Sequence, residues 1–183
     1  MDVNFSVVDA TEVEPVVFEQ ILGEKPGGGI VANPAFDIVT GTAVGYDSGA
    51  LKPIKAYRLV KAVASGDTTI EIAKGSGVLV GDIIANVKKG VACTAVDSSN
   101  ATKDVVTVTM GVAIANDTVL YQAAGASASA AVPVYTPSFL TGAKVLAGKG
   151  DQAVKLVNFA NVRKETVNAS AEVIALLQTI KTV

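Results

Sequence analysis

Histidine and tryptophan are absent from this 183-residue chain, and cysteine occurs only once. Without histidine, a hydrolase triad of the Ser–His–acid type cannot form, and a thiol lacks its commonest activating partner. The single cysteine, Cys93, cannot form an intramolecular disulfide, and its β-rich surroundings predict a buried, inert thiol. A zinc site would need a cluster of cysteine and histidine, which the sequence does not contain. We therefore expect no catalytic residues, no metal site and no cofactor, which predicts a protein that is not an enzyme.

Charged residues are also scarce, at 17% of the chain, and the net charge is −2. Acidic and basic residues are interspersed along the sequence, so no basic stripe is available to neutralise phosphates, and we expect no nucleic-acid partner. The first residues lack the basic and apolar regions of a signal peptide. The longest uncharged run, residues 118–144, is interrupted by glycines, prolines and serines, which argues against a membrane-spanning helix.

Half of the chain is apolar, mostly alanine, valine, isoleucine and leucine, while aromatic residues make up only 5%. The length allows one domain with an arm or a second small unit. The mean hydropathy of +0.45 is high for a soluble monomer. Since a membrane segment is disfavoured, we expect extra apolar surface to be buried between subunits of a homo-oligomer.

Residues 68–123 contain short runs rich in valine, isoleucine and threonine, separated by turn residues. We expect about five strands here, among them residues 69–73, 83–85, 91–96 and 105–110. Their spacing of roughly 8–12 residues is typical of a sandwich or a small barrel. The predicted fold is therefore mainly β, a small antiparallel β-sandwich or barrel with a short C-terminal α-helix.

The chain divides into four segments by composition. Residues 1–35 are expected to form an N-terminal arm, which either contacts a neighbour or is a frayed terminus. Residues 36–123 form the β domain, beginning with a hairpin that turns at Asp47-Ser48-Gly49. Residues 124–136 are a small-residue linker or loop, unless they form a flat, closely packed strand. Residues 137–183 add further strands and the helix, and we expect them to pack with the β domain as one compact unit.

The spacing of apolar residues changes from a period of two to a period of 3.6 residues near the C-terminus. This change predicts a helix of roughly 12 residues capped by Asn168 or Ser170. The apolar stripe of this helix consists of Val173, Leu176, Leu177 and Ile180. A helix of this length must bury its stripe on something. Docking on the β domain is the favoured interpretation, and pairing with a neighbouring subunit is the alternative, so these four residues are the candidate subunit-interface residues.

Two glycine motifs resemble nucleotide-binding signatures. Gly75-Ser76-Gly77 lacks the third glycine and the following helix of a dinucleotide fingerprint, and Gly148-Lys149-Gly150 lacks the spacing and hydroxyl residue of a phosphate-binding loop. Both are expected to be turns.

Residues 51–123 resemble the head fibre proteins of tailed bacteriophages and related prophages, especially those of gut Bacteroidales. The resemblance is carried by the strand start at residues 67–70, by the turns at residues 74–82 and 95–100, and by the segment 111–121. The match covers about two fifths of the chain and follows turns and strands, not an active site. It implies a virion structural protein, a head fibre or capsid-decoration subunit. Such proteins are usually trimeric and sit on the capsid exterior, so the implied partners are further copies of the chain and the major capsid protein. The implied location is the virion, after synthesis in the host cytoplasm.

The sequence is also compatible with two other functions. A β-sandwich adhesin or carbohydrate-binding module without catalysis would need exposed aromatic side chains, for which the candidates are Tyr46, Tyr57, Tyr121 and Tyr135. A carboxylate-based hydrolase would need two acidic residues within about 10 Å of each other in a cleft.

Overall fold

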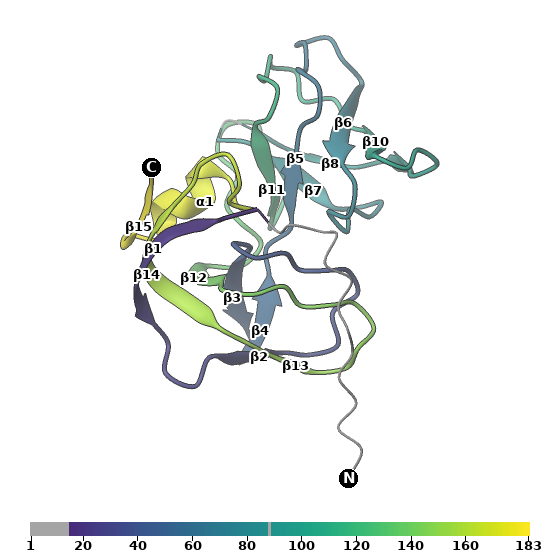
Figure 1. The fold of residues 1–183 in the computed structure, drawn as a ribbon. Coiled ribbons are helices and arrows are strands. Elements are labelled where there is room, and N and C mark those ends of the chain that lie inside the picture. Colours follow the sequence, from purple (N-terminus) through teal and green to yellow (C-terminus); the bar gives the residue numbers. More distant parts are fainter. Residues whose placement is uncertain (1–14, 88) are drawn as a thin grey trace.

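The computed structural model describes residues 15–87 and 89–183. These residues form fifteen strands and one short helix, and Figure 1 shows the strands gathered in two lobes. The first lobe contains the segments before residue 54 and after residue 136, and the second lobe contains the segment between them. The predicted mainly β fold with antiparallel sheets and a short C-terminal helix is confirmed, and its sheets do not close into a barrel.

The first lobe is built on a six-stranded sheet in the order β1-β14-β12-β3-β4, with β15 also paired to β14. Its strands are β1 (Phe18–Glu24), β3 (Ala43–Asp47), β4 (Ala50–Pro53), β12 (Pro137–Thr141), β14 (Leu156–Val162) and β15 (Ile180–Thr182). All neighbours are antiparallel except β14 and β15, which are parallel. A two-stranded sheet of β2 (Gly29–Val31) and β13 (Gln152–Val154) completes this lobe.

The hairpin of β3 and β4 forms where the sequence predicts it. Asp47 pairs with Ala50, so the loop consists of Ser48 and Gly49, which have φ angles of 49° and 84°. Positive φ at both positions is the geometry of a tight two-residue hairpin turn, which glycine adopts at little cost. The strand that contains Pro53 lies at the edge of the sheet, where the missing N–H of proline breaks no ladder.

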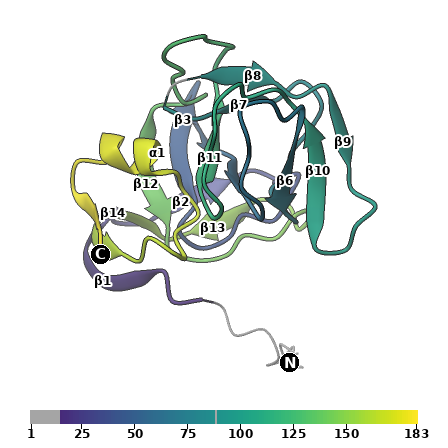
Figure 2. The same cartoon turned by 90° about the horizontal axis from the view of Figure 1, so that it is seen from above.

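The second lobe contains two smaller sheets. One has the order β5-β11-β7-β8, formed by β5 (Ala56–Arg58), β11 (Val119–Ala123), β7 (Ile83–Ala85) and β8 (Gly90–Ala92). The other has the order β6-β10-β9, formed by β6 (Thr69–Ala73), β10 (Lys103–Thr107) and β9 (Ala95–Asp97). Figure 2 shows β9 and β10 at the outer rim of this lobe, far from β1.

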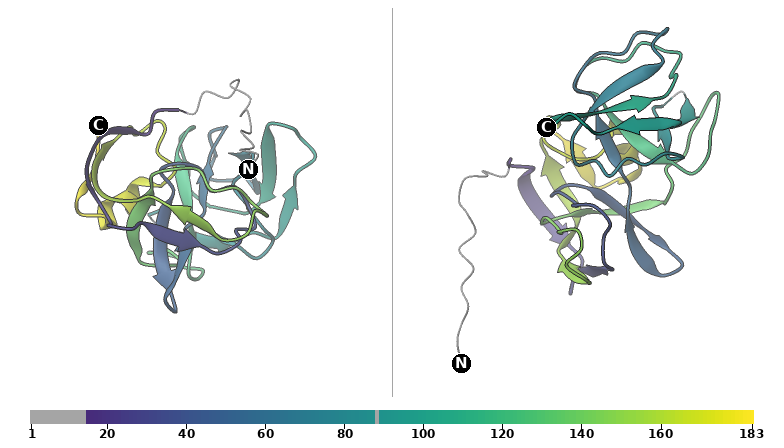
Figure 3. Two further views of the ribbon diagram at one scale, coloured as in Figure 1. Left: turned by 60° about the horizontal axis from the view of Figure 1, so that its bottom comes forward. Right: turned by 90° about the vertical axis from the view of Figure 1, so that its right-hand side faces the viewer.

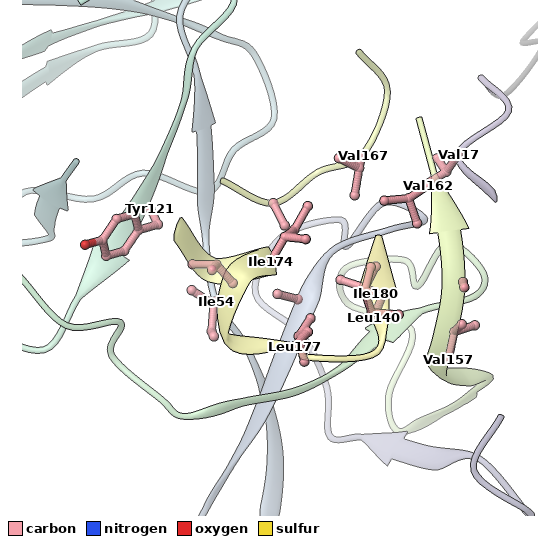
Figure 4. Close-up of a cluster of buried hydrophobic side chains, with 14 of the residues drawn as sticks. Val17, Ile54, Tyr121, Leu140, Val157, Val162, Val167, Ile174, Leu177 and Ile180 are labelled. Atoms are coloured by element: carbon pink, nitrogen blue, oxygen red, sulfur yellow. The ribbon is translucent and has the colours of Figure 1, made fainter. Parts of the chain in front are cut away.

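The core consists of three groups of buried apolar side chains. One lies inside the second lobe and includes Tyr57, Ile72 and Leu120. A smaller one lies inside the first lobe, between the six-stranded sheet and β2–β13, and includes Val44 and Leu156. The third group joins the lobes, because it contains residues of both; Figure 4 shows it, with Val17, Ile54, Tyr121, Leu140, Val157, Val162, Val167, Ile174, Leu177 and Ile180 labelled. The views in Figure 3 agree that the two lobes lie against each other.

The C-terminal helix is shorter than the sequence predicts. Helix α1 (Ala171–Leu176) has six residues, and the Ser170 side chain caps it by accepting a hydrogen bond from the Val173 N–H. The other predicted cap, Asn168, instead donates to the Thr42 hydroxyl. The chain leaves the helix at Leu177 because Ile180 pairs with Ala160 as part of β15. The backbone ladder with β14 therefore replaces the last turn of the expected helix.

Several predicted segments have different boundaries. Of the expected N-terminal arm, residues 1–14 lie outside the described part of the chain, while β1 and β2 belong to the sheets of the first lobe. The run 91–96 is divided between β8 and β9, which lie in different sheets. The Cys93 N–H still donates to the Asp82 carbonyl in register with β7, whereas the Thr94 N–H donates to the Thr107 carbonyl of β10, so the chain changes sheet between these two residues. Residues 124–136 lie between β11 and β12, form neither a strand nor a helix, and connect the second lobe to β12.

Candidate functional site

The most buried cluster of charged and polar side chains lies at one end of the second lobe. Lys55 precedes β5 and Asp82 precedes β7, and the Lys55 ammonium lies 2.7 Å from the Asp82 Oδ2 atom. The two side chains are only 11% and 10% exposed. Strand β11 lies between β5 and β7, and it contributes Gln122, whose amide donates to Asp82 Oδ1 at 3.2 Å. We call Lys55, Tyr57, Asp82 and Gln122 the Asp82 cluster.

The carboxylate of Asp82 receives four hydrogen bonds. Besides those from Lys55 and Gln122, its Oδ2 accepts one from the Tyr57 hydroxyl at 3.0 Å and one from the Leu79 N–H at 2.9 Å. An ionised carboxylate can accept about four hydrogen bonds, which is the number that Asp82 accepts. The Lys55 ammonium also lies 5.8 Å from the centre of the Phe36 ring, which adds a cation–π contact with a loop of the first lobe.

Burial shifts two weakly acidic groups near this cluster. Tyr57 has no exposed surface, and burial together with the negative charge of Asp82 raises the pKa of its phenol far above the usual value. Burial also raises the pKa of the Cys93 thiol, and the Asp82 charge acts in the same direction. Both groups are therefore neutral at physiological pH, so Cys93 is not a thiolate nucleophile, in agreement with its buried, unbridged state.

The Asp82 cluster is arranged to stabilise the fold. A general base needs a lone pair directed at a substrate, and a nucleophile needs an open approach. Asp82 has its oxygens occupied by donors of the chain itself, and Lys55 is committed to Asp82. This cluster is difficult to predict from the sequence, because Gly81-Asp82 is identifiable only as a turn and the side chains that bind Asp82 lie 25 to 40 residues away.

A cluster of metal-ligating side chains is not found in the described part of the chain. Within residues 15–87 and 89–183, no group of three or more Cys, Asp or Glu side chains could hold a metal ion. The other ion pairs are more exposed and mostly join neighbouring strands. They are Lys61–Glu71, Lys74–Asp104, Lys103–Glu71, Lys144–Asp37, Lys155–Glu24 and Arg163–Glu19.

The four tyrosines proposed as a binding platform do not lie together. Tyr57 and Tyr121 are buried, and the Tyr121 hydroxyl donates to the Ala131 carbonyl at 2.7 Å, which fixes the loop between the lobes. Tyr135 is half-buried against the core. Tyr46 alone is exposed, at 43%, and its ring meets the edge of Phe139 with the centroids 6.4 Å apart.

Tyr46 lies beside a shallow groove of the first lobe. The Lys25 ammonium lies 5.5 Å from the centre of the Tyr46 ring and donates to its hydroxyl at 2.8 Å. The groove next to Lys25 is lined by residues 24–28 and 153–155. One aromatic ring, one ammonium group and the Glu24–Lys155 ion pair therefore border this groove.

The four candidate subunit-interface residues have different surroundings. Val173, Leu177 and Ile180 are 1%, 6% and 5% exposed, because they pack in the apolar group that joins the lobes. Leu176 is 54% exposed. The chain itself thus covers three of the four side chains, and of the four only Leu176 is exposed.

No helix within the described residues is long and apolar enough to cross a membrane. Comparisons with protein-family models, with curated proteins and with solved structures gave no match for this chain.

Proposed function

We propose that this chain is a structural protein of a bacteriophage virion, a head fibre or capsid-decoration subunit that assembles as a homo-oligomer on the capsid exterior. The observation that supports this proposal most directly is the place of the resemblance to head fibre proteins in the fold. The resembling segment, residues 51–123, coincides with β4 and the second lobe, which has a buried apolar group of its own. Apart from β4, which belongs to the six-stranded sheet of the first lobe, the resembling segment is this one folded unit, which is easier to explain by common structure than by chance.

Two further features are consistent with this role. The most buried ionic group, the Asp82 cluster, has its charges paired within the chain. A protein that stays folded on the outside of a particle benefits from such internal pairing more than from an open polar cleft. Apolar side chains are exposed on both lobes and are available for contacts between copies. They include Leu22, Leu79, Phe159 and Leu176. In this proposal the chain performs no catalysis, and its partners are further copies, with a trimer favoured, and the major capsid protein.

The direct test is to look for the protein on particles. An antiserum raised against the purified recombinant chain should label the capsid surface, not the tail, of phage particles prepared from the source strain and viewed by electron microscopy. Mass spectrometry of the same particles, purified on a density gradient, should find the chain at tens of copies or more per major capsid assembly. Its absence from purified particles that contain the capsid protein would contradict the proposal.

The second candidate is a carbohydrate-binding module, and the observation that favours it is the exposed Tyr46 ring, which packs on the half-buried Phe139 near the groove at residues 24–28. A sugar ring can stack on an exposed aromatic face while charged side chains bind its hydroxyls. A glycan array would detect such binding, and the binding should disappear in Tyr46→Ala while Tyr135→Phe retains it. A blank array with folded protein would exclude this function.

A further inference from the structure

The Asp82 cluster brings an amine and a carboxyl group together inside the protein. The Lys55 Nζ atom lies 2.7 Å from Asp82 Oδ2, and the two side chains are 11% and 10% exposed. In every other ion pair of residues 15–87 and 89–183, at least one side chain is 32% exposed or more. Lys55 and Asp82 are therefore the one ion pair in these residues that water hardly reaches.

The backbone holds both residues in place. The Gln122 N–H donates to the Lys55 carbonyl at 3.0 Å, which fixes Lys55 beside β11. The Cys93 N–H donates to the Asp82 carbonyl at 2.8 Å, which fixes Asp82 at the end of β8. Strand β11 lies between β5 and β7 (Figure 1), so the two side chains meet across it. Well-oriented groups held in this way react as if at concentrations of about 10⁵ M or more.

We propose that Lys55 and Asp82 condense to an isopeptide bond, a covalent cross-link between the starts of β5 and β7. A bond forms between Lys55 Nζ and Asp82 Cγ, and the bond between Cγ and Oδ2 breaks. Oδ2 leaves as water with two protons from the ammonium, and the amide nitrogen keeps the third. The ion pair and the amide plus water contain the same atoms and the same net charge, so the step needs no oxidant, reductant or further reactant.

The two carboxyl oxygens have partners that suit these different fates. Oδ1 accepts from the Gln122 amide at 3.2 Å, and such a donor stabilises the negative charge that develops on this oxygen when the nitrogen adds to Cγ. Oδ2 lies against the ammonium protons with which it leaves. The Tyr57 hydroxyl and the Leu79 N–H also donate to Oδ2, and the water formed there can accept both hydrogen bonds.

The surroundings favour the amide over the ion pair. Condensation removes two buried charges, and keeping such charges out of water is costly. The Phe36 ring covers Lys55 from the first lobe, with its centre 5.8 Å from Nζ, and Tyr57 has no exposed surface. A bond in this place is shielded from the water that would hydrolyse it. The inference goes beyond the proposed function and does not depend on it.

Mass spectrometry of the denatured full-length protein tests the proposal. We expect the wild-type chain to weigh less than its sequence by one water molecule. Lys55→Arg keeps a positive charge beside Asp82 but lacks the amine, so this variant should have its full mass. A wild-type chain that keeps its full mass after prolonged incubation overturns the proposal, and so does an equal loss of water in Lys55→Arg.

Tryptic digestion locates the bond. Trypsin should fail to cleave after Lys55, and one branched peptide should join the segments that contain Lys55 and Asp82. The matched control in the same chain is Glu24–Lys155, whose charged atoms are 2.6 Å apart but whose side chains are 40% and 45% exposed. This pair should remain unlinked. A branched peptide at Glu24–Lys155 as well would contradict the role assigned to burial.

Removal of the donor to Oδ1 tests the reaction step. Gln122→Leu and Gln122→Met should slow the condensation by about 10²-fold, the usual loss for one such donor. The purified variants should therefore contain chain of full mass that loses water slowly, while circular dichroism shows that they are folded. Folded variants that are completely cross-linked from the start would contradict the role of Gln122.

The same measurement separates this inference from the proposed function. Phage particles that contain the chain at its full mass would overturn the cross-link and leave the structural role intact. A cross-linked recombinant chain that is absent from particles would contradict the structural role and leave the cross-link intact.

Discussion

Lys55 and Asp82 are 27 residues apart in the sequence, yet they form a 2.7 Å salt bridge that is about nine-tenths buried. The pair connects the starts of β5 and β7, which are separated by β11 in their sheet. Tyr57 and Gln122 complete the hydrogen bonds of the carboxylate. Because the charges are removed from water, each depends on the other.

Asp82→Ala should therefore destabilise the protein severely. The substitution leaves the Lys55 ammonium buried without a counter-charge, which typically costs about 3–5 kcal/mol of unfolding free energy. Urea unfolding followed by circular dichroism measures this loss. Glu24→Ala is the matched control, because its partner Lys155 is 45% exposed and such surface pairs contribute about 0–1 kcal/mol. Equal losses in the two variants would contradict the assignment of the Asp82 cluster as the dominant ionic contact.

The buried tyrosines make stability depend on alkaline pH. Burial raises the pKa of both Tyr57 and Tyr121 above the usual 10.0. Above pH 10 the unfolded chain loses these phenol protons while the folded chain keeps them, so the unfolding free energy decreases as the pH rises. Stability from this source is fully present below pH 10 and decreases by up to about 1.4 kcal/mol per pH unit for each tyrosine.

Urea unfolding at pH 9, 10 and 11 measures this dependence. Tyr57→Phe should reduce the slope above pH 10 by about one proton, because the variant has one buried phenol fewer. Absorbance at 295 nm should show that Tyr57 ionises only when the protein unfolds. The absorbance difference between wild type and Tyr57→Phe isolates this phenol, and a difference that titrates at pH 10 in the folded protein would show that Tyr57 is accessible to water.

Local sequence predicts much of this fold because local rules decide it. The alternation of Ile70 and Ile72 predicts β6, and Asp47-Ser48-Gly49 predicts the hairpin turn. Ser170 is identifiable as a helix cap because its side chain acts within three residues. These features need no knowledge of distant segments.

The remaining features depend on contacts between distant segments. The run 91–96 alternates like one strand, but the Cys93 N–H bonds to the Asp82 carbonyl beside β7 and the Thr94 N–H bonds to the Thr107 carbonyl of β10, so the chain changes sheet between them. Ile180 has the spacing of the helical stripe, but its backbone pairs with β14 as part of a strand. The side chains that bind Asp82 come from two distant segments, at β5 and β11, and nothing near Asp82 in the sequence identifies them. The stripe and its favoured docking on the chain itself could be argued from the sequence, whereas the early end of the helix and the strand at Ile180 could not.

Adjacent leucines at the end of α1 should respond differently to truncation. Leu177 is 6% exposed and packs between the lobes, so Leu177→Ala should cost about 2–5 kcal/mol of unfolding free energy. Leu176 is 54% exposed, and Leu176→Ala should stay within about 0.5 kcal/mol of wild type. Thermal unfolding of the two variants compares them directly. A large loss in Leu176→Ala at high protein concentration, and not at low, would show that another subunit covers this side chain.

Gly75 and Gly77 provide the last test, because they lie in one turn and share a positive φ but differ in their surroundings. Their φ angles are 86° and 67°, which an alanine adopts at a cost of roughly 1–2 kcal/mol. A Cβ atom at Gly75 would meet nothing within 4 Å, whereas one at Gly77 would lie 2.4 Å from the Phe36 ring. Gly75→Ala should therefore lose only the backbone cost.

Gly77→Ala should lose more than Gly75→Ala by roughly 1–3 kcal/mol, the usual cost of overpacking. The Phe36 ring must move to admit the methyl group, and that movement also disturbs the cation–π contact with Lys55. The double variant Gly77→Ala with Phe36→Ala should recover the overpacking part of the loss, because no ring remains to collide with the new Cβ. If the two single glycine variants unfold at the same urea concentration, the turn at residues 74–77 is not packed against Phe36, and the Asp82 cluster lacks its contact with the first lobe.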